Sequence, residues 1–194
     1  MATKLVLASA SPRRHTLLAA AGFKFQIARA AVAERFDRNL TLRELTLYNA
    51  ARKGLFVARS QPHAVVLAAD TLVAIDDEII GKPADLKRAG KILRRLSGRT
   101  HDVCTSVAIF QLSKARVSIF CEISYVHFRT LTTNAIRAYL AKVNPLDKAG
   151  AYAAQDIGSE IIESIDGSFT NVVGLPMERT TAELRRFAIE PVSI

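Results

Sequence analysis

Short apolar runs alternate with stretches in which apolar residues recur at helical spacing, and the alternation begins at the N-terminus. Lys4–Ala10 is a short apolar run, which is typical of a buried strand. Ser11 is a good N-cap residue, and Pro12 fits the first position of a helix. The apolar residues that follow define one helical face, and Gly22 is suited to end this helix.

The rest of the chain continues this mixture of strands and helices. Strand patterns cover Phe23–Ala31, Ala64–Ile75, Glu78–Ile80, His101–Leu112, Arg116–Arg129 and Glu160–Ile165, with Asp76-Asp77 as a hairpin turn. Helix patterns run from a capping box at Thr41 to about Ser60, over Leu86–Leu96, from Thr132 or Thr133 to about Lys142, and over Thr180–Phe187. This order predicts an α/β fold, in which a mixed sheet is flanked by helices.

Length and composition favour one compact domain. The chain has 194 residues, of which 49% are hydrophobic, so it can build a sizeable core. We expect residues 1–194 to form a single domain, with two lobes as the alternative arrangement. No apolar run is long enough to cross a bilayer, and the N-terminus lacks the layout of a signal peptide. Cys104 and Cys121 form no CxxC motif, and free thiols fit a reducing cytoplasm.

The net charge of +9 predicts an anionic partner. Nucleic acid, a membrane surface and phosphorylated small molecules all satisfy that condition. The basic helical segment 87–99 keeps nucleic acid as an alternative. However, aromatic residues make up only 7% of the chain and there is no tryptophan, so a platform on which bases stack is poorly supported. Charge alone therefore leaves the partner open, with nucleic acid disfavoured.

Two arginines stand at the start of the first predicted helix. Arg13 and Arg14 follow Pro12, where positive side chains oppose the helix dipole. Either both side chains point into water, or an anion binds among them.

Asp70 is an acid within an otherwise apolar strand pattern, VVLAADTLVAI, which Asp70 and Thr71 interrupt. Aspartate is rarely buried without a partner. One interpretation places Asp70 at a bend or strand end, where backbone amides cap it. The other makes it a general base or metal ligand at a strand terminus, with a pKa set by nearby cations. Thr71 could hydrogen-bond a ligand or only its own backbone.

Other candidates are weaker when each is considered alone. Lys82 follows a glycine and could reach a phosphate, or it could be a solvated loop lysine. Because Pro83 follows it, the stretch is not a Walker A loop. Lys53 and Glu34 are indistinguishable from ordinary surface residues. Gln155 lies in a stretch rich in glycine and alanine, which is either a ligand-binding loop or a tight structural turn.

Six motifs together resemble one family. The stretches LVLASASPRR, AADTLV, IIGKP, LSGRTHDV, DKAGAYAAQ and GSFTNVVGLP occur in the order found in Maf proteins, which are nucleoside triphosphate pyrophosphatases once called septum-formation inhibitors. The resemblance extends from Leu5 to about Phe187. It implies an elongated α/β structure with a central cleft, similar to the inosine triphosphate pyrophosphatases. It also implies cleavage between the α and β phosphates, a divalent cation (Mg²⁺ or Mn²⁺) and a homodimer.

The resemblance assigns roles to individual residues. Asp70 matches the proposed proton acceptor, and Glu34 and Asp70 are the residues that would hold the metal. The residues that would contact the substrate are Ser9, Arg13, Arg14, Lys53, Thr71, Lys82 and Gln155. Whether Asp70 serves as base, as ligand or as both stays open.

Three positions separate the subfamilies by substrate. Arg13, Thr71 and Gln155 match the group that favours dTTP and UTP, whereas the group that favours 7-methyl-GTP has Trp, Gln and Glu there. The sequence therefore predicts a dTTP and UTP pyrophosphatase, with modified pyrimidine nucleotides as further candidate substrates. The alternatives are the 7-methyl-GTP type and a protein that binds nucleic acid or regulates cell division.

Overall fold

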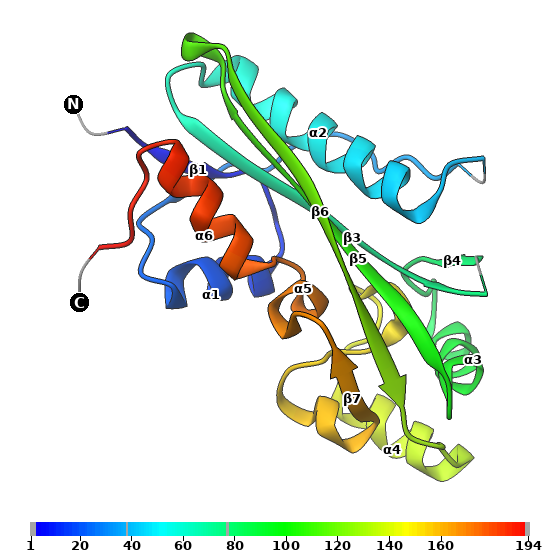
Figure 1. Cartoon of the computed structure of the whole chain (residues 1–194). Coiled ribbons are helices and arrows are strands. Elements are labelled where there is room, and N and C mark those ends of the chain that lie inside the picture. The colour runs from blue at the N-terminus through cyan, green and yellow to red at the C-terminus, as the bar shows by residue number, and fades with distance from the viewer. Residues whose placement is uncertain (1–2, 38, 77, 193–194) are drawn as a thin grey trace. The chain divides into compact units, whose positions relative to one another are not determined.

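The computed structural model describes residues 3–37, 39–76 and 78–192 (Figure 1). Its seven-stranded sheet has the order β2-β1-β3-β5-β6-β7, with β4 paired to β3 outside this path. The strands are β1 (Leu5–Leu7), β2 (Gln26–Ile27), β3 (Val65–Ile75), β4 (Glu78–Ile80), β5 (Thr100–Gln111), β6 (Arg116–Phe128) and β7 (Ile162–Asp166). β1 runs parallel to β2 and β3, whereas β4 is antiparallel to β3 and β7 to β6. The predicted mixed sheet with helices is confirmed.

The chain divides into two compact units, and three of the strands contribute to both. The first consists of Met1–Asp70, Thr105–Glu122 and Gly174–Ile194, and the second of Thr71–Cys104 and Ile123–Val173. Three of the four boundaries fall within β3, β5 and β6, and the fourth lies between Val173 and Gly174. Each unit has its own buried apolar residues and is described below by itself.

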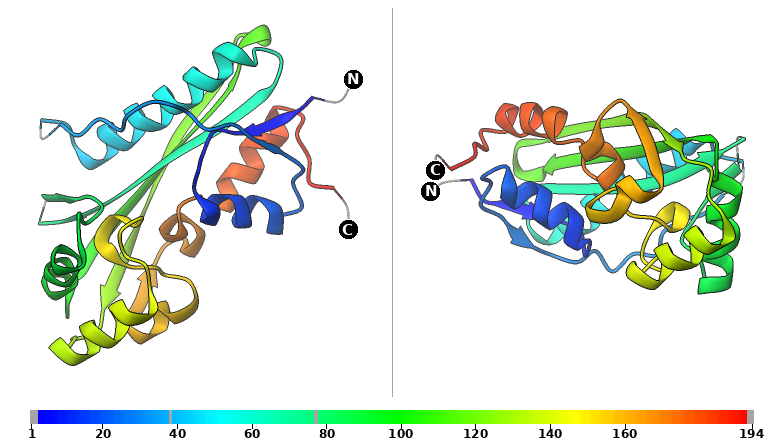
Figure 2. Two further views of the ribbon diagram at one scale, coloured as in Figure 1. Left: turned by 180° about the vertical axis from the view of Figure 1, so that it is seen from behind. Right: turned by 90° about the horizontal axis from the view of Figure 1, so that it is seen from below.

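Strand alternation gives unit 1 two separate cores. Successive strand residues point to opposite faces, so odd and even positions of one strand enter different layers. Val65, Leu67 and Ala69 of β3 belong to one core, with α1 (Pro12–Ala20) and α6 (Met177–Arg186). Val66 and Ala68 belong to the other, with α2 (Leu42–Ser60). Figures 1 and 2 show α2 and α6 on opposite sides of these strands.

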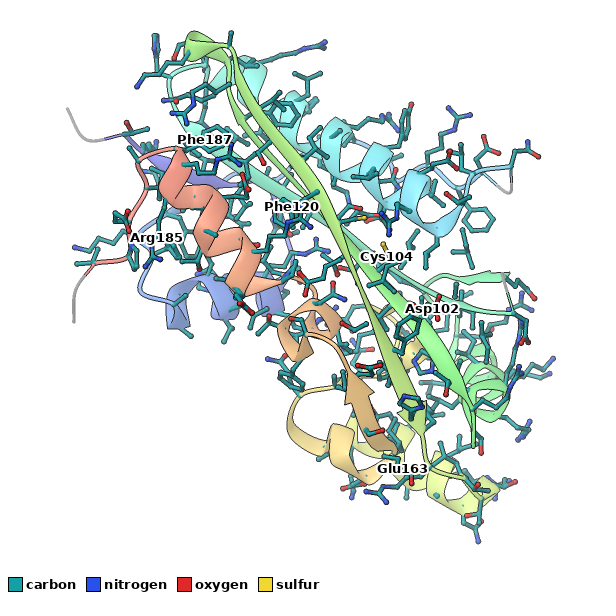
Figure 3. All side chains as sticks on the ribbon, viewed as in Figure 1. Asp102, Cys104, Phe120, Glu163, Arg185 and Phe187 are labelled. Carbon is teal, nitrogen blue, oxygen red and sulfur yellow. The ribbon has the colours of Figure 1, made fainter. Side chains whose placement is uncertain are left out.

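The two layers of unit 1 differ in the size of their side chains. The α2 layer is rich in alanine, and a Cβ on Gly54 would lie 2.7 Å from a ring carbon of Phe110, so this helix approaches β5 closely. The opposite layer holds larger residues. Two arginines lie over aromatic rings of this layer. Arg179 lies over Phe120 and Arg116 over Phe187, two rings labelled in Figure 3.

Unit 2 has one core, formed by strands and by helices α3 (Leu86–Leu96) and α4 (Thr133–Lys142). Leu93 of α3 and Tyr139 of α4 pack with Val103 and Phe128 of the sheet. The remaining elements are α5 (Phe169–Val173) and the 3₁₀ turns Ala149–Ala151 and Asp156–Glu160; a third turn, Leu112–Lys114, lies in unit 1.

Several local predictions were wrong. The strand expected over Phe23–Ala31 is only Gln26–Ile27, and both of these residues are exposed. Phe25 and Ala28 on either side pack against the cores of unit 1 without continuing the strand. Asp70-Thr71 does not interrupt its strand, because β3 continues to Ile75. By contrast, the prediction that Ser11 is the N-cap residue of α1 is confirmed, although its side chain makes no capping hydrogen bond. Helix α5 was not predicted.

Hydrogen bonds test the helix caps that the sequence predicts. The capping box at Thr41 is confirmed, with Glu44 as its acidic partner. Thr132, and not Thr133, caps α4, because its hydroxyl accepts from the amide of Ala135 at 3.1 Å. Asp77, the second residue of the predicted hairpin turn, lies outside the described residues.

Cys104 of β5 is a buried thiol (Figure 3), whereas Cys121 is only half-buried. Within the described ranges, no helix combines the length and apolar character that crossing a membrane requires.

Candidate functional site

Lys53 joins two carboxylates in unit 1. Its ammonium nitrogen lies 2.6 Å from Oδ1 of Asp70 and 2.7 Å from Oε1 of Glu34. The Asp70 side chain is only 4% exposed and that of Lys53 13%, while the Glu34 side chain is 45% exposed. One cation thus neutralises a buried acid and links it to a second acid that solvent reaches.

The register of β3 explains why Asp70 meets Lys53. Val66, Ala68 and Asp70 alternate along the strand on the face covered by α2, and Lys53 lies on that helix. A buried carboxylate is costly unless it is paired. The strand therefore places the acid under a helix that supplies its counter-ion, and the expected bend or strand end is not needed.

Two opposing effects set the acidity of Asp70. Burial raises the pKa of its carboxyl above the ordinary value. The nearby cations Lys53 and Arg14 lower the pKa of this carboxyl, while Glu34 adds to the rise. A carboxylate whose pKa is displaced upward is better matched to accept a proton near neutral pH.

Arg14 is buried and fixed at the start of α1. Its Nε donates to the carbonyl of Gly174 at 2.8 Å, and its Nη1 donates to Oγ of Ser9 at 3.3 Å. The Ser9 hydroxyl also accepts from the amide of Ser11. Arg14 is 9% exposed, so this arginine does not point into water. Burial lowers the pKa of its guanidinium, and the charge of Asp70 opposes that effect.

Arg13 is half-buried on the same turn, and its positive charge is close enough to lower the pKa of Arg14. Two guanidinium groups therefore lie at the N-terminus of α1, where the helix dipole already favours an anion. The arrangement is suited to a phosphate group.

Six of the predicted residues lie in unit 1: Ser9, Arg13, Arg14, Glu34, Lys53 and Asp70. The other three lie in unit 2. Thr71 is a half-buried residue of β3, and Lys82 is exposed between β4 and α3. Gln155 is half-buried immediately before a 3₁₀ turn, where its carbonyl accepts from the amide of Gly158.

Asn49 is a contributor that was not predicted. Its Nδ2 lies 3.3 Å from Oδ2 of Asp70, and the same side chain bonds to the backbone of Arg35. It is 3% exposed. The available signal was a polar residue four positions before Lys53, a spacing that places both residues on one side of α2.

Glu34 and Asp70 are the carboxylates available to a cation in this part of unit 1. Among the described residues, no cluster of three or more His, Cys, Asp or Glu side chains could hold a metal ion. Mg²⁺ typically binds through one or two carboxylates together with water and substrate phosphates. Two acids beside a group of cations are donors that a Mg²⁺ ion could use if water and phosphate oxygens completed its ligands.

The family model described as Maf-like protein matches residues 4–187. The chain belongs to the Maf family. The dTTP/UTP pyrophosphatase of Bacillus pumilus is 44% identical to this Maf chain over 188 residues, which cover 97% of it and 98% of the relative. The protein of the same name from Bacillus velezensis is 41% identical, over 98% of this chain and 100% of that relative.

More distant relatives of this Maf chain carry the same name. The dTTP/UTP pyrophosphatase of Pelotomaculum thermopropionicum is 40% identical over 95% of the chain and 96% of the relative. Among solved structures, a HAM1 protein from Coxiella burnetii gives a TM-score of 0.43 at 18% identity, covering 66% of this chain and 73% of that one. At that score the likeness adds nothing to the family assignment.

Proposed function

We propose that this chain is a nucleoside triphosphate pyrophosphatase that hydrolyses dTTP and UTP to the monophosphate and pyrophosphate. The observation that carries the proposal is the Lys53 bridge between Asp70 and Glu34, close to the charge of Arg14. Membership of the Maf family supports the reaction. The names of full-length relatives at 40–44% identity support the pyrimidine substrates.

Charge explains how the residues of unit 1 would act. A triphosphate carries about four negative charges, so positioning and charge neutralisation dominate phosphoryl chemistry. Arg13 and Arg14 would bind phosphate oxygens together with the N-terminus of α1, and the Ser9 hydroxyl holds Arg14 in place. Lys53 would keep Asp70 ionised in spite of its burial.

Asp70 would serve as the general base. The water oxygen attacks the α phosphorus, its proton passes to an Asp70 oxygen, and the bridging oxygen leaves on the β phosphate as pyrophosphate. Glu34 and Asp70 would hold a Mg²⁺ or Mn²⁺ ion, which supplies charge neutralisation at the phosphates when bound. The roles of Lys82 at the phosphates and of Arg13, Thr71 and Gln155 in substrate choice rest on the resemblance.

A panel of triphosphates tests this function. The purified chain is incubated with dTTP, UTP, dCTP, GTP or 7-methyl-GTP and Mg²⁺ or Mn²⁺, and orthophosphate is measured with and without added inorganic pyrophosphatase. We expect a signal only with the coupling enzyme, highest for dTTP and UTP, and abolished by a chelator. Direct release of orthophosphate would contradict cleavage between the α and β phosphates, and a preference for 7-methyl-GTP would contradict the substrate assignment.

A further inference from the structure

Residues 33–35 have no regular secondary structure, yet side chains of α2 hold their backbone. The amide of Arg35 donates to Oδ1 of Asn49 at 2.9 Å, and Nδ2 of Asn49 donates to the carbonyl of Arg35 at 3.0 Å. With these two bonds the Asn49 side chain pairs with the backbone of Arg35 as a residue of a neighbouring β-strand would. Arg52 adds a bond from its guanidinium to the carbonyl of Ala33 at 3.2 Å. Glu34 therefore lies on a segment fixed on both sides.

The same Asn49 amide also contacts the Asp70 carboxylate on β3. Its Nδ2 carries two hydrogens, and the second partner, Oδ2 of Asp70, lies 3.3 Å away. The other Asp70 oxygen accepts from Lys53 at 2.6 Å. Both oxygens of the buried carboxylate are therefore held by α2, from positions one helical turn apart.

We propose that Asn49 is a positioning residue, which ties the backbone beside Glu34 to the Asp70 carboxylate and so fixes the two acids around Lys53. The inference rests on the proposed function, because it assigns Asp70 and Glu34 to the reaction. In this assignment Asn49 itself binds neither the phosphates nor the nucleobase of the substrate. Its loss should therefore reduce turnover more than substrate affinity, since displacement of a reacting group by about 1 Å can cost roughly 100-fold in rate.

Asn49→Leu tests this role, because leucine has nearly the same size and no hydrogen-bonding group. We expect kcat for dTTP to fall by about 10- to 100-fold while KM changes by less than about 3-fold. We also expect the Arg35 amide to exchange with deuterium about 10-fold faster, because it loses its acceptor. Asn49→Ser, which is too short to join Arg35 to Asp70, should give the same pattern if Asn49→Leu fails to fold.

Thr46→Val is the matched control. Thr46 is buried on the same helix, and its hydroxyl bonds to Oγ of Ser106 at 2.7 Å and to the backbone carbonyls of Leu42 and Arg43 at 3.0 Å. This variant should lose stability but keep wild-type kcat and wild-type exchange at Arg35. Unchanged kcat and unchanged exchange in folded Asn49 variants would overturn the positioning role, as would an equal loss of kcat in Thr46→Val. Hydrogen exchange at Arg35 is measured without substrate turnover. A wild-type chain that hydrolyses no triphosphate would therefore refute the proposed function independently of the exchange result.

Discussion

Asp70 lies in the α2-facing row of β3, where an unpaired carboxylate would be strongly destabilising. Lys53 supplies its counter-ion at 2.6 Å, and Asn49 bonds its second oxygen. The expected alternatives were a strand end capped by backbone amides and a functional acid at a strand terminus. The residue is instead a mid-strand acid paired with side chains, and this environment raises its pKa through burial.

Replacing Asp70 by asparagine removes the proposed base while preserving its shape. We expect Asp70→Asn to lower kcat/KM for dTTP by about 100- to 10,000-fold, as for other general bases, with a folded chain by circular dichroism. Asp76→Asn is the control, because Asp76 is exposed and pairs with Arg99 in unit 2. Near-wild-type turnover would rule out Asp70 as the base. Partial rescue of Asp70→Asn by excess Mn²⁺ would favour the role of metal ligand.

Caps and strand register act at the scale of the element. Periodicity located the long helices and strands, but the hydrogen-bonding residue at each end depends on local geometry. Thr41 forms its predicted capping box, whereas the side chain of Ser11 makes no capping hydrogen bond. At α4, two adjacent threonines offered the same chemistry, and only Thr132 is placed to accept from an amide of the first turn.

This neighbouring pair gives a matched test of helix stability. We expect Thr132→Ala to lower the free energy of unfolding by about 1 kcal/mol, because the amide of Ala135 loses its acceptor. The melting midpoint should fall by roughly 2–4 °C in a chain of this size. Thr133→Ala, one residue further and also exposed, should change stability by less than about 0.5 kcal/mol. Equal effects of the two substitutions would contradict the assignment of the cap.

Stability of the whole molecule should depend on one buried histidine. His101 is 1% exposed in unit 2, with Nε2 2.8 Å from the Tyr152 hydroxyl and its ring edge-to-face with Phe128. Burial lowers the pKa of His101 from 6.5 to about 4. The unfolded chain therefore binds a proton at mildly acidic pH that the folded chain rejects. The contribution of His101 to stability is fully present above the pKa of the unfolded chain. It is lost as the pH falls toward the pKa of His101 in the folded chain.

As the pH falls from 6.5 to 4, His101 alone should lower the free energy of unfolding by about 3 kcal/mol. His101→Gln, which keeps a partner for Tyr152, should therefore show a smaller loss of stability over this range in denaturant titrations. His63→Gln, at an exposed loop position, should follow the wild type. The comparison cancels the carboxylates common to both variants. Identical pH profiles for wild type and His101→Gln would show that His101 does not carry this dependence.

The sequence by itself determined the mixed α/β class, most helices and strands, the basic character and the motifs of the Maf family. These properties are local, because apolar periodicity and capping residues act over a few positions. Only the tertiary structure brought Lys53 to Asp70 and Glu34, placed Arg14 on the carbonyl of Gly174, and gave Asn49 its contacts. Those partners lie 17 to 160 residues apart in the chain, so strand register and helix packing select them.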